Sequence, residues 1–412
     1  MTLKICMHGV EMSPSKENVI AGGVPNSTMR LAKKLQTNGT AVFIVTNDRK
    51  YRETGAKVDN FNDDSVKFFL FQIKHKYPSL KFSLIYFIKT LREIKRIKDH
   101  EHPNIIHGHS GRIELAIITG VASKYANVPC VHTIYCPIKD SNSRYNLLLA
   151  KFINRYVSKL IAISDNVRLS LRSIGITENK IEFIPPIIDF DKFRPGAGGV
   201  EVRHSLGIAD DEFMIFYLGN LTLTKGFGSV LDAMHSVKEE RHKVKLVTGL
   251  EFTHTATGER ESEFQDKIND LGLGSDIIGL GLISNVERFM DAADIVVAPF
   301  QHTFDVADYP MTILEAMAVG TPVITTPVGG IPEIMINGIN GILIPSCDPS
   351  TLSSAIMDLI KDPEKIKKIG NKAAFDIRRS LPDAEIRDKM INAYNQTISQ
   401  NQRCTHEKIP RN

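Results

Sequence analysis

Short apolar runs alternate with amphipathic segments along most of the chain. Residues 3–8 and 41–46 are apolar runs of strand length, and between them apolar residues recur at helical spacing over residues 29–35. This β–α–β order is typical of parallel strands joined by helices. The alternation starts again at residues 213–218 and continues past residues 294–299. The pattern therefore predicts an α/β protein with two domains, each with helices covering a parallel sheet.

The boundary between the two domains is predicted near Pro186. The apolar run at residues 180–185 leads into Pro185-Pro186, and the fixed φ angles of consecutive prolines imply a stiff connector. The predicted domains are therefore 1–186 and 187–382.

The stretch 308–333, DYPMTILEAMAVGTPVITTPVGGIPE, carries the densest local signals. Thr312 and Glu315 have the spacing of a capping box, which predicts a helix start, and Gly320 is expected to end that helix. A buried strand and a Gly-Gly turn follow, and a helix N-terminus that faces such a turn is a ready site for phosphate. The alternative is one more βαβ element with an ordinary capped helix.

Composition and charge exclude several classes of protein. The 412 residues carry a formal net charge of +4, too small to indicate a nucleic-acid partner. The five cysteines are scattered and form no CxxC pair, so we expect a reducing cytoplasm and neither a disulfide framework nor a zinc site. Residues 1–10 lack the apolar core of a signal peptide, and no apolar run is long enough to span a bilayer. We therefore expect a cytoplasmic protein.

The run LEAMAVGTPVI followed by GGIPE closely resembles the donor-binding signature of the retaining family-4 glycosyltransferases of GT-B fold, the glycosyl transferases group 1. The resemblance extends over nearly the whole chain. It implies two doubly wound, Rossmann-like domains that face a central cleft. Domain 1–186 would lie on the acceptor side, with the helix at 383–400 packed back onto it, and domain 187–382 would bind the nucleotide sugar.

The resemblance also implies which residues bind the donor. Lys225 matches a family lysine that holds the diphosphate, whereas Asn220 stands where the family has an arginine and supplies no charge. Glu315 matches the glutamate that holds the ribose hydroxyls, with a capping-box glutamate as the alternative. Gly22-Gly23 matches a glycine loop over the donor phosphate, with a plain turn as the alternative. The implied donor-binding residues are Gly22, Gly23, Asn220, Lys225, Thr312, Ile313, Leu314 and Glu315.

Two residues are candidates for the reaction centre. The family has a glutamate eight positions before the one in LEAMA, which falls on Ala307, so the neighbouring Asp308 is predicted to contact the donor sugar, with a turn residue as the alternative. His109 follows an apolar strand at the edge where parallel sheets bind ligands, and is predicted to line the acceptor cleft. His132 lies inside a strand, as core histidines do, and Tyr135 stands where related enzymes often have a histidine.

Residues 65–100 differ in character from the rest of the chain. They contain nine Lys or Arg and two acidic residues, with apolar and aromatic residues between them. A basic amphipathic stretch indicates contact with an anionic membrane surface, and a solvated helix packed on its sheet is the alternative. The apolar residues predicted to share one face and serve the core are Leu84, Ile85, Ile88, Leu91 and Ile94.

The predicted activity is therefore sugar transfer from a nucleotide diphosphate sugar, such as a UDP-sugar, to an acceptor hydroxyl. By resemblance the transfer proceeds with retention and needs neither a metal nor a cofactor. The acceptor would be a carbohydrate or lipid-linked, in polysaccharide, lipopolysaccharide or glycolipid synthesis, at the inner face of the membrane. Two alternatives stay open: a nucleotide-sugar epimerase of the same fold, and a catalytically weak partner subunit that binds sugar nucleotides.

Overall fold

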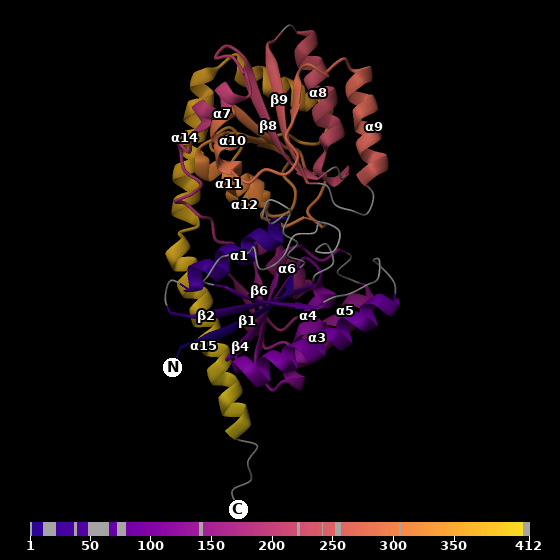
Figure 1. The fold of residues 1–412 in the computed structure, drawn as a ribbon, viewed down its shortest axis with the longest axis vertical. Coiled ribbons are helices and arrows are strands. Elements are labelled where there is room, and N and C mark those ends of the chain that lie inside the picture. Colours follow the sequence, from indigo (N-terminus) through magenta and orange to yellow (C-terminus); the bar gives the residue numbers. More distant parts are fainter. Residues whose placement is uncertain are drawn as a thin grey trace, which may run out of the picture. The chain divides into compact units, whose positions relative to one another are not determined.

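A computed structural model describes residues 2–10, 22–36, 39–47, 66–71, 80–139, 143–220, 223–240, 242–251, 257–304 and 306–406 (Figure 1). The chain divides into two compact units. Unit 1 comprises Met1–Ile187, Val306–Asp308 and Asp383–Asn412, and unit 2 comprises Ile188–Asp305 and Tyr309–Pro382.

Unit 1 is built on a seven-stranded sheet in the order β3-β2-β1-β4-β5-β6-β7, with every described pair of strands parallel. The strand order reverses between β1 and β4, which pair from Ile5 and Ile105 to His8 and Gly108. The strands are β1 (Lys4–Val10), β2 (Ala41–Asn47), β3 (Lys67–Phe71), β4 (Ile105–Ser110), β5 (Cys130–Ile134), β6 (Lys159–Ala162) and β7 (Ile181–Phe183).

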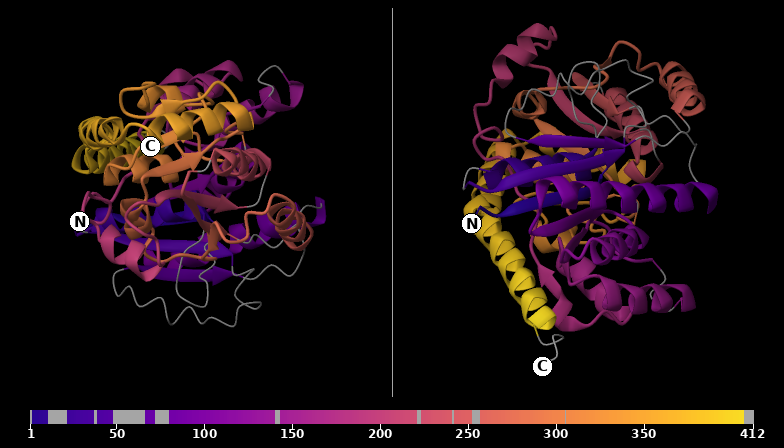
Figure 2. Two further views of the ribbon diagram at one scale, coloured as in Figure 1. Left: turned by 90° about the horizontal axis from the view of Figure 1, so that it is seen from above. Right: turned by 60° about the horizontal axis from the view of Figure 1, so that its bottom comes forward.

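The helices of unit 1 connect these strands, and the last helix of the chain also belongs to this unit. The side chain of Ser164 accepts a hydrogen bond from the amide of Val167 and so caps α6, as serine commonly does. Figure 2 shows α15, in yellow, as one long helix. The helices are α1 (Gly23–Gln36), α3 (Leu80–Glu101), α4 (Ile113–Tyr125), α5 (Arg144–Tyr156), α6 (Asp165–Ser173) and α15 (Asp383–His406), with a 3₁₀ turn, η2, at Glu178–Lys180.

The sheet of unit 2 has six strands in the order β10-β9-β8-β11-β12-β13, again parallel in every described pair. Its order reverses between β8 and β11. The strands are β8 (Phe213–Asn220), β9 (Val244–Glu251), β10 (Ile277–Gly279), β11 (Ile295–Ala298), β12 (Val323–Thr325) and β13 (Ile342–Leu343). The predicted class, two doubly wound α/β units, is confirmed.

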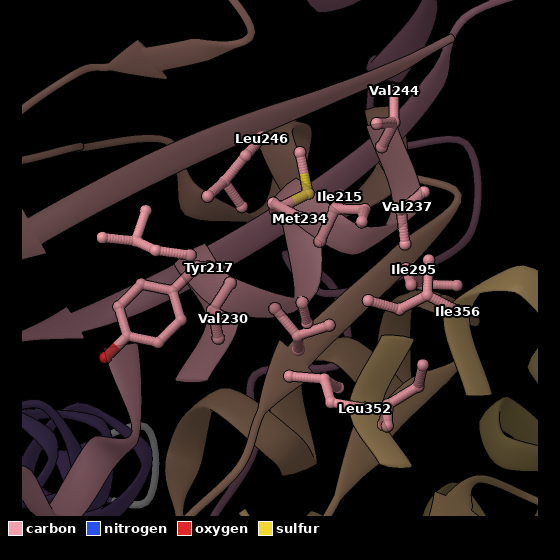
Figure 3. Packing of buried hydrophobic residues seen from close by; sticks show 14 of the residues in the cluster. Ile215, Tyr217, Val230, Met234, Val237, Val244, Leu246, Ile295, Leu352 and Ile356 are labelled. Carbon is pink, nitrogen blue, oxygen red and sulfur yellow. The ribbon is translucent and has the colours of Figure 1, made fainter. Parts of the chain in front are cut away.

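One hydrophobic cluster joins the sheet of unit 2 to its helices (Figure 3). Ile215 and Leu246 from the strands contact a cluster that includes Met234 of α8 and Leu352 of α13, all fully buried. The helices are α7 (Gly199–Ser205), α8 (Phe227–Glu239), α9 (Thr257–Asp270), α10 (Val286–Ala292), α11 (Met311–Val319), α12 (Ile331–Ile334), α13 (Pro349–Ile360) and α14 (Pro363–Ser380), with a 3₁₀ turn, η3, at Leu223–Lys225.

The predicted apolar face of α3 is only partly correct. The side that packs on the sheet contains Tyr86, Thr90, Ile94 and Ile97, all buried. Leu84 and Ile88, which were expected to serve the core, are 59% and 39% exposed. The buried set recurs every three to four residues, and Leu84 and Ile88 fall on another side of the helix. None of the described helices has the length and apolarity that a membrane span needs.

Candidate functional site

The open edge of the unit 2 sheet lies where its strand order reverses. Ligands of doubly wound sheets bind at such a point, beyond the carboxyl ends of the strands. Asn220 ends β8 and Pro299 follows β11, so these two residues lie on either side of the reversal. Because a helix that follows a parallel strand starts at the same edge, α8 and α11 both begin here.

The turn at Lys225 and Gly226 is fixed to the exit of β11. Gly226 has a φ of 67°, and a Cβ atom there would lie 2.4 Å from the carbonyl oxygen of Pro299. The amide of Gln301 donates a hydrogen bond of 2.9 Å to the carbonyl of Thr224. Position 226 therefore needs glycine for both its backbone conformation and its close approach to β11.

The side chain of Lys225 lies over the end of β8. A Cβ atom on Gly219 would stand 2.8 Å from Cδ of Lys225 and 3.3 Å from its Nζ. The absence of a side chain at Gly219 makes room for the lysine stem, so the ammonium group lies beside the residue that precedes Asn220. The structure thus brings together Asn220 and Lys225, two of the predicted donor-binding residues.

Tyr217 holds the two ends of this loop, a role that was not among the predictions from the sequence. Its ring is buried in the core cluster, and its hydroxyl lies 3.4 Å from the carbonyl oxygens of both Asn220 and Lys225. Burial raises the pKa of Tyr217 far above its usual value, so the hydroxyl stays protonated and can donate. In the sequence, an aromatic residue inside a strand indicates only core packing.

The helix α11 begins differently from the prediction. It starts at Met311, and its N-cap is Pro310, whose side chain makes no capping hydrogen bond. The prediction that Thr312 caps the helix is therefore wrong: proline fixes a suitable φ without a polar cap, and Thr312 falls inside the first turn. The predicted end is confirmed, because Gly320 is the C-cap with a φ of 89°.

The residues around the start of α11 are fixed by burial and by a hydrogen bond to α12. Ile313, Leu314 and Glu315 are buried, and Glu315 is only 6% exposed. The hydroxyl of Tyr309 donates a hydrogen bond of 2.7 Å to Oε2 of Glu333, which ties the entry of α11 to α12. The first amides of a helix have no carbonyl partner within it, and its dipole is positive there, so this end can attract an anion.

In unit 1, the corresponding strand reversal brings four histidines together. His8, His107, His109 and His132 lie on β1, β4 and β5 and are fully or almost fully buried. Their hydrogen-bond partners include Thr119 for His8, Tyr394 and Thr133 for His107, Tyr135 for His109 and Ser110 for His132. Among the described side chains, no group of His, Cys, Asp or Glu has the arrangement of a metal site.

Burial keeps these four histidines uncharged. It lowers the pKa of His8 to about 4 and that of His107 and His109 well below the usual value. The pKa of His132 falls for the same main reason, and the neighbouring histidines lower the last three further. Nε2 of His109 and Nδ1 of His132 are buried without a hydrogen-bond partner in the described structure.

Asp308 lies in unit 1, at the start of α6. Its side chain is fully buried, and it accepts hydrogen bonds from Oγ of Ser164 at 2.5 Å and from Nδ2 of Asn166 at 3.1 Å. Its amide donates to the carbonyl of Tyr135 at 2.7 Å. These donors stabilise a carboxylate inside the protein.

Tyr135 links the two residues predicted for the reaction centre. Its backbone carbonyl binds Asp308, and its hydroxyl lies 3.2 Å from Nδ1 of His109. The same hydroxyl donates to Oγ of Ser27 on α1, at 3.4 Å. Tyr135, Ser27 and Thr133 line a small cavity, and its remaining walls are apolar, formed by residues including Leu31, Ile184 and Met390.

The predicted glycine turn of unit 1 leads directly into α1. Gly22 has a φ of 99°, and its carbonyl accepts hydrogen bonds from both the amide and the side chain of Asn26, at 3.2 and 3.0 Å. Gly23 is the first residue of the helix.

Comparison with known families gives two matches that together span most of the chain. The family model described as Glycosyltransferase Family 4 matches residues 21–192, and the model described as Glycosyl transferases group 1 matches residues 201–375. One match falls in each half of the chain.

Similar proteins include an uncharacterized glycosyltransferase of Methanocaldococcus jannaschii, 26% identical over 95% of this chain and 98% of that protein. The UDP-Gal:alpha-D-GlcNAc-diphosphoundecaprenol alpha-1,3-galactosyltransferase of Escherichia coli is 24% identical over 84% of each chain. The crystal structure of Anabaena HepE in complex with UDP and glucose superposes with a TM-score of 0.77 and 19% identity, over 95% of this chain and 99% of that one. The last likeness is one of fold.

Replacing Tyr217 with Phe should loosen the loop between Asn220 and Lys225. The hydroxyl's hydrogen bonding is worth about 1 kcal/mol, which corresponds to about fivefold faster local opening. Hydrogen–deuterium exchange in peptides covering 216–228 should accelerate by that factor. The control Tyr125→Phe changes an exposed tyrosine in α4 and should leave these peptides unchanged. Equal exchange in wild type and Tyr217→Phe would show that the hydroxyl does not hold the loop.

The buried histidines should make the protein less stable in mild acid. Their folded pKa values are depressed, so below pH 6.5 the unfolded chain binds protons that the folded chain does not, and stability falls as the pH falls. Each such histidine contributes about 1.4 kcal/mol per pH unit in this range.

Urea unfolding between pH 7 and pH 5 measures this slope. His8→Gln should reduce the slope by about one proton, because the pKa of His8 lies near 4 in the folded chain. His204→Gln, at an exposed position in α7, is the matched control and should leave the slope unaltered. A free energy of unfolding that is constant from pH 7 to pH 5.5 would contradict the prediction.

Proposed function

Since the chain belongs to the family-4 glycosyltransferases of GT-B fold, we propose that it transfers a hexose from a nucleotide diphosphate sugar to an acceptor hydroxyl, with retention. The observation that carries the donor assignment is the Lys225–Gly226 turn, fixed at the strand reversal of unit 2, at the sheet edge where α11 begins. The complex of Anabaena HepE with UDP and glucose supports a uridine nucleotide as the donor.

The proposed chemistry places positive charge where negative charge develops. The bond between the anomeric carbon and the diphosphate oxygen breaks, and that carbon forms a bond to the acceptor oxygen. Lys225 and the positive end of α11 would stabilise the departing diphosphate. Asn220 would donate a hydrogen bond without adding charge. We assign no general base, because the leaving diphosphate can take the acceptor's proton.

Glu315 and the Gly22-Gly23 turn keep their predicted roles as proposals, whereas the proposed role of Asp308 and His109 differs from the predicted contacts with the donor sugar and the acceptor cleft. Glu315 would accept hydrogen bonds from the ribose hydroxyls, and Gly22 and Gly23 remain proposed ligand contacts on the strength of the family resemblance. For Asp308 and His109 we propose that they act by positioning Tyr135. Neither side chain has exposed surface, and both residues bind Tyr135 directly.

The proposed acceptor is a carbohydrate or a lipid-linked sugar, in the synthesis of a polysaccharide, lipopolysaccharide or glycolipid. The name of the Escherichia coli relative, which acts on a diphosphoundecaprenol-linked sugar, supports this class. The proposed location is the cytoplasm, with peripheral attachment to the inner face of the membrane.

Nucleotide binding tests the donor site. UDP, GDP and ADP should be compared in a thermal-shift assay, since a ligand that binds only the folded state raises the apparent melting temperature. We expect UDP to stabilise the protein most. Lys225→Met should weaken its affinity by about tenfold to a hundredfold, since hydrogen bonds to charged groups contribute about 1.5–3 kcal/mol. Lys225→Arg should retain part of the affinity, because it keeps the charge.

The matched control is Lys368→Met, which removes an exposed lysine from α14. Its UDP affinity should equal that of the wild type. If Lys225→Met and Lys368→Met bind UDP equally well, Lys225 does not hold the diphosphate and the donor assignment is wrong.

Product analysis distinguishes the transferase from its alternatives. The transferase should release a free nucleotide diphosphate only when an acceptor is present, and NMR of the product should show the anomeric configuration of the donor. A new sugar nucleotide without a free diphosphate would indicate an epimerase. Nucleotide binding without turnover on any donor and acceptor would indicate a partner subunit that only binds sugar nucleotides. This alternative is worth testing because residue 220 is an asparagine where the family has an arginine.

A further inference from the structure

The outer face of α5 exposes an unusual number of large apolar side chains. The helix packs onto unit 1 through Asn146, Leu149, Ala150 and Ile153. On its other sides, four residues are each more than 40% exposed, namely Tyr145, Leu147, Leu148 and Phe152. Single exposed apolar residues are common on proteins, but four on one short helix make this face a candidate binding surface.

The same face carries only positive charge. Arg144, Lys151 and Arg155 are exposed between the apolar residues, and the segment 144–156 contains no Asp or Glu. One nearby acidic residue, Glu114 of α4, is already paired, since it contacts Arg112 at 3.4 Å and lies 3.5 Å from the hydroxyl of Tyr145. The face therefore combines three cations with apolar and aromatic side chains.

The face continues onto α4, which packs beside α5, and from there onto α3, which packs beside α4 (Figure 1). Nζ of Lys124 lies 5.4 Å from the ring of Tyr156, and Nζ of Lys95 lies 5.5 Å from the ring of Tyr125. These cation–π contacts connect the ends of the three helices. On α3, the exposed residues Leu84, Ile88 and Arg92 add to the surface, and the carboxylate of Glu93 is bound by Arg96.

We propose that this outer face, centred on α5 and extended by α4 and α3, docks on an anionic lipid bilayer. Cations attract acidic headgroups, and Tyr, Phe and Leu side chains bury themselves at the depth of the headgroup boundary. A second copy of the chain fits the face less well, because it would bring the same cations against each other. Of the basic stretch 65–100 predicted from the sequence, the described part of α3 supplies only a portion of this surface, and residues 72–79 lie outside the described residues.

Only the purpose of the docking rests on the proposed function, because a lipid-linked acceptor would lie in the bilayer on which this surface docks. The docking itself can be tested separately. Full-length protein is mixed with vesicles of phosphatidylcholine alone or with added phosphatidylglycerol, and the bound fraction is measured by flotation at low and high salt. The wild type should bind the anionic vesicles at low salt and dissociate at high salt.

Two variants of α5 separate the contributions. Lys151→Glu/Arg155→Glu should bind anionic vesicles at least about tenfold more weakly, because each cation near the surface is worth about a factor of five. Leu148→Ser/Phe152→Ser should also bind more weakly while retaining the salt dependence. The control Lys368→Glu/Phe375→Ser changes an exposed cation and an exposed aromatic on α14, and should bind as the wild type does.

Several outcomes would overturn the proposal. It fails if the wild type ignores anionic vesicles at low salt, or if the α5 variants bind as tightly as the control. It also fails if the wild type dimerises and Leu148→Ser/Phe152→Ser abolishes only the dimer. The thermal shift with UDP should be the same in all variants. A normal UDP shift with no vesicle binding would refute the docking surface and leave the proposed transferase intact.

Discussion

The attachment of the Lys225–Gly226 turn to the end of β11 is the contact on which the proposed donor site depends. A cation on a free loop would lose much of its binding energy to the cost of being ordered. Here the close approach of Gly226 to Pro299 and the bond between Gln301 and Thr224 fix the turn from the side of β11. Tyr217 holds it from the side of β8. The lysine is therefore positioned before a ligand arrives, which is what electrostatic stabilisation of a leaving group requires.

Unit 1 uses buried polar groups in a different way. Burial keeps the four histidines at its strand reversal neutral, and most of their nitrogen atoms are hydrogen-bonded to hydroxyl groups of threonine, serine and tyrosine. Asp308 stays inside the protein because Ser164 and Asn166 satisfy its carboxylate. His109 and Asp308 both bind Tyr135, and Tyr135 lines a cavity. In our proposal, His109 and Asp308, which are both fully buried, act by positioning Tyr135.

The two units also differ in where their positive charges lie. In unit 2, Asn220 replaces an arginine, so Lys225 contributes the one cation among the predicted donor-binding residues. In unit 1, by contrast, the cations gather on the outer surface of three helices, together with exposed apolar residues. A ligand with a small, concentrated charge suits the first arrangement, and an extended charged surface suits the second.

The sequence by itself determined the parallel βα architecture, the strand segments, the helix end at Gly320 and the position of the lysine-glycine turn, because periodicity and turn chemistry are local properties. The tertiary structure alone decided which side of α3 is buried, that Thr312 does not cap α11, and that Asp308 binds Ser164, 144 residues away in the chain. It also revealed the contacts of Tyr217 and Tyr135. Those outcomes depend on which distant residues meet across a sheet or helix layer, and a side chain's local sequence does not encode the identity of its distant partner.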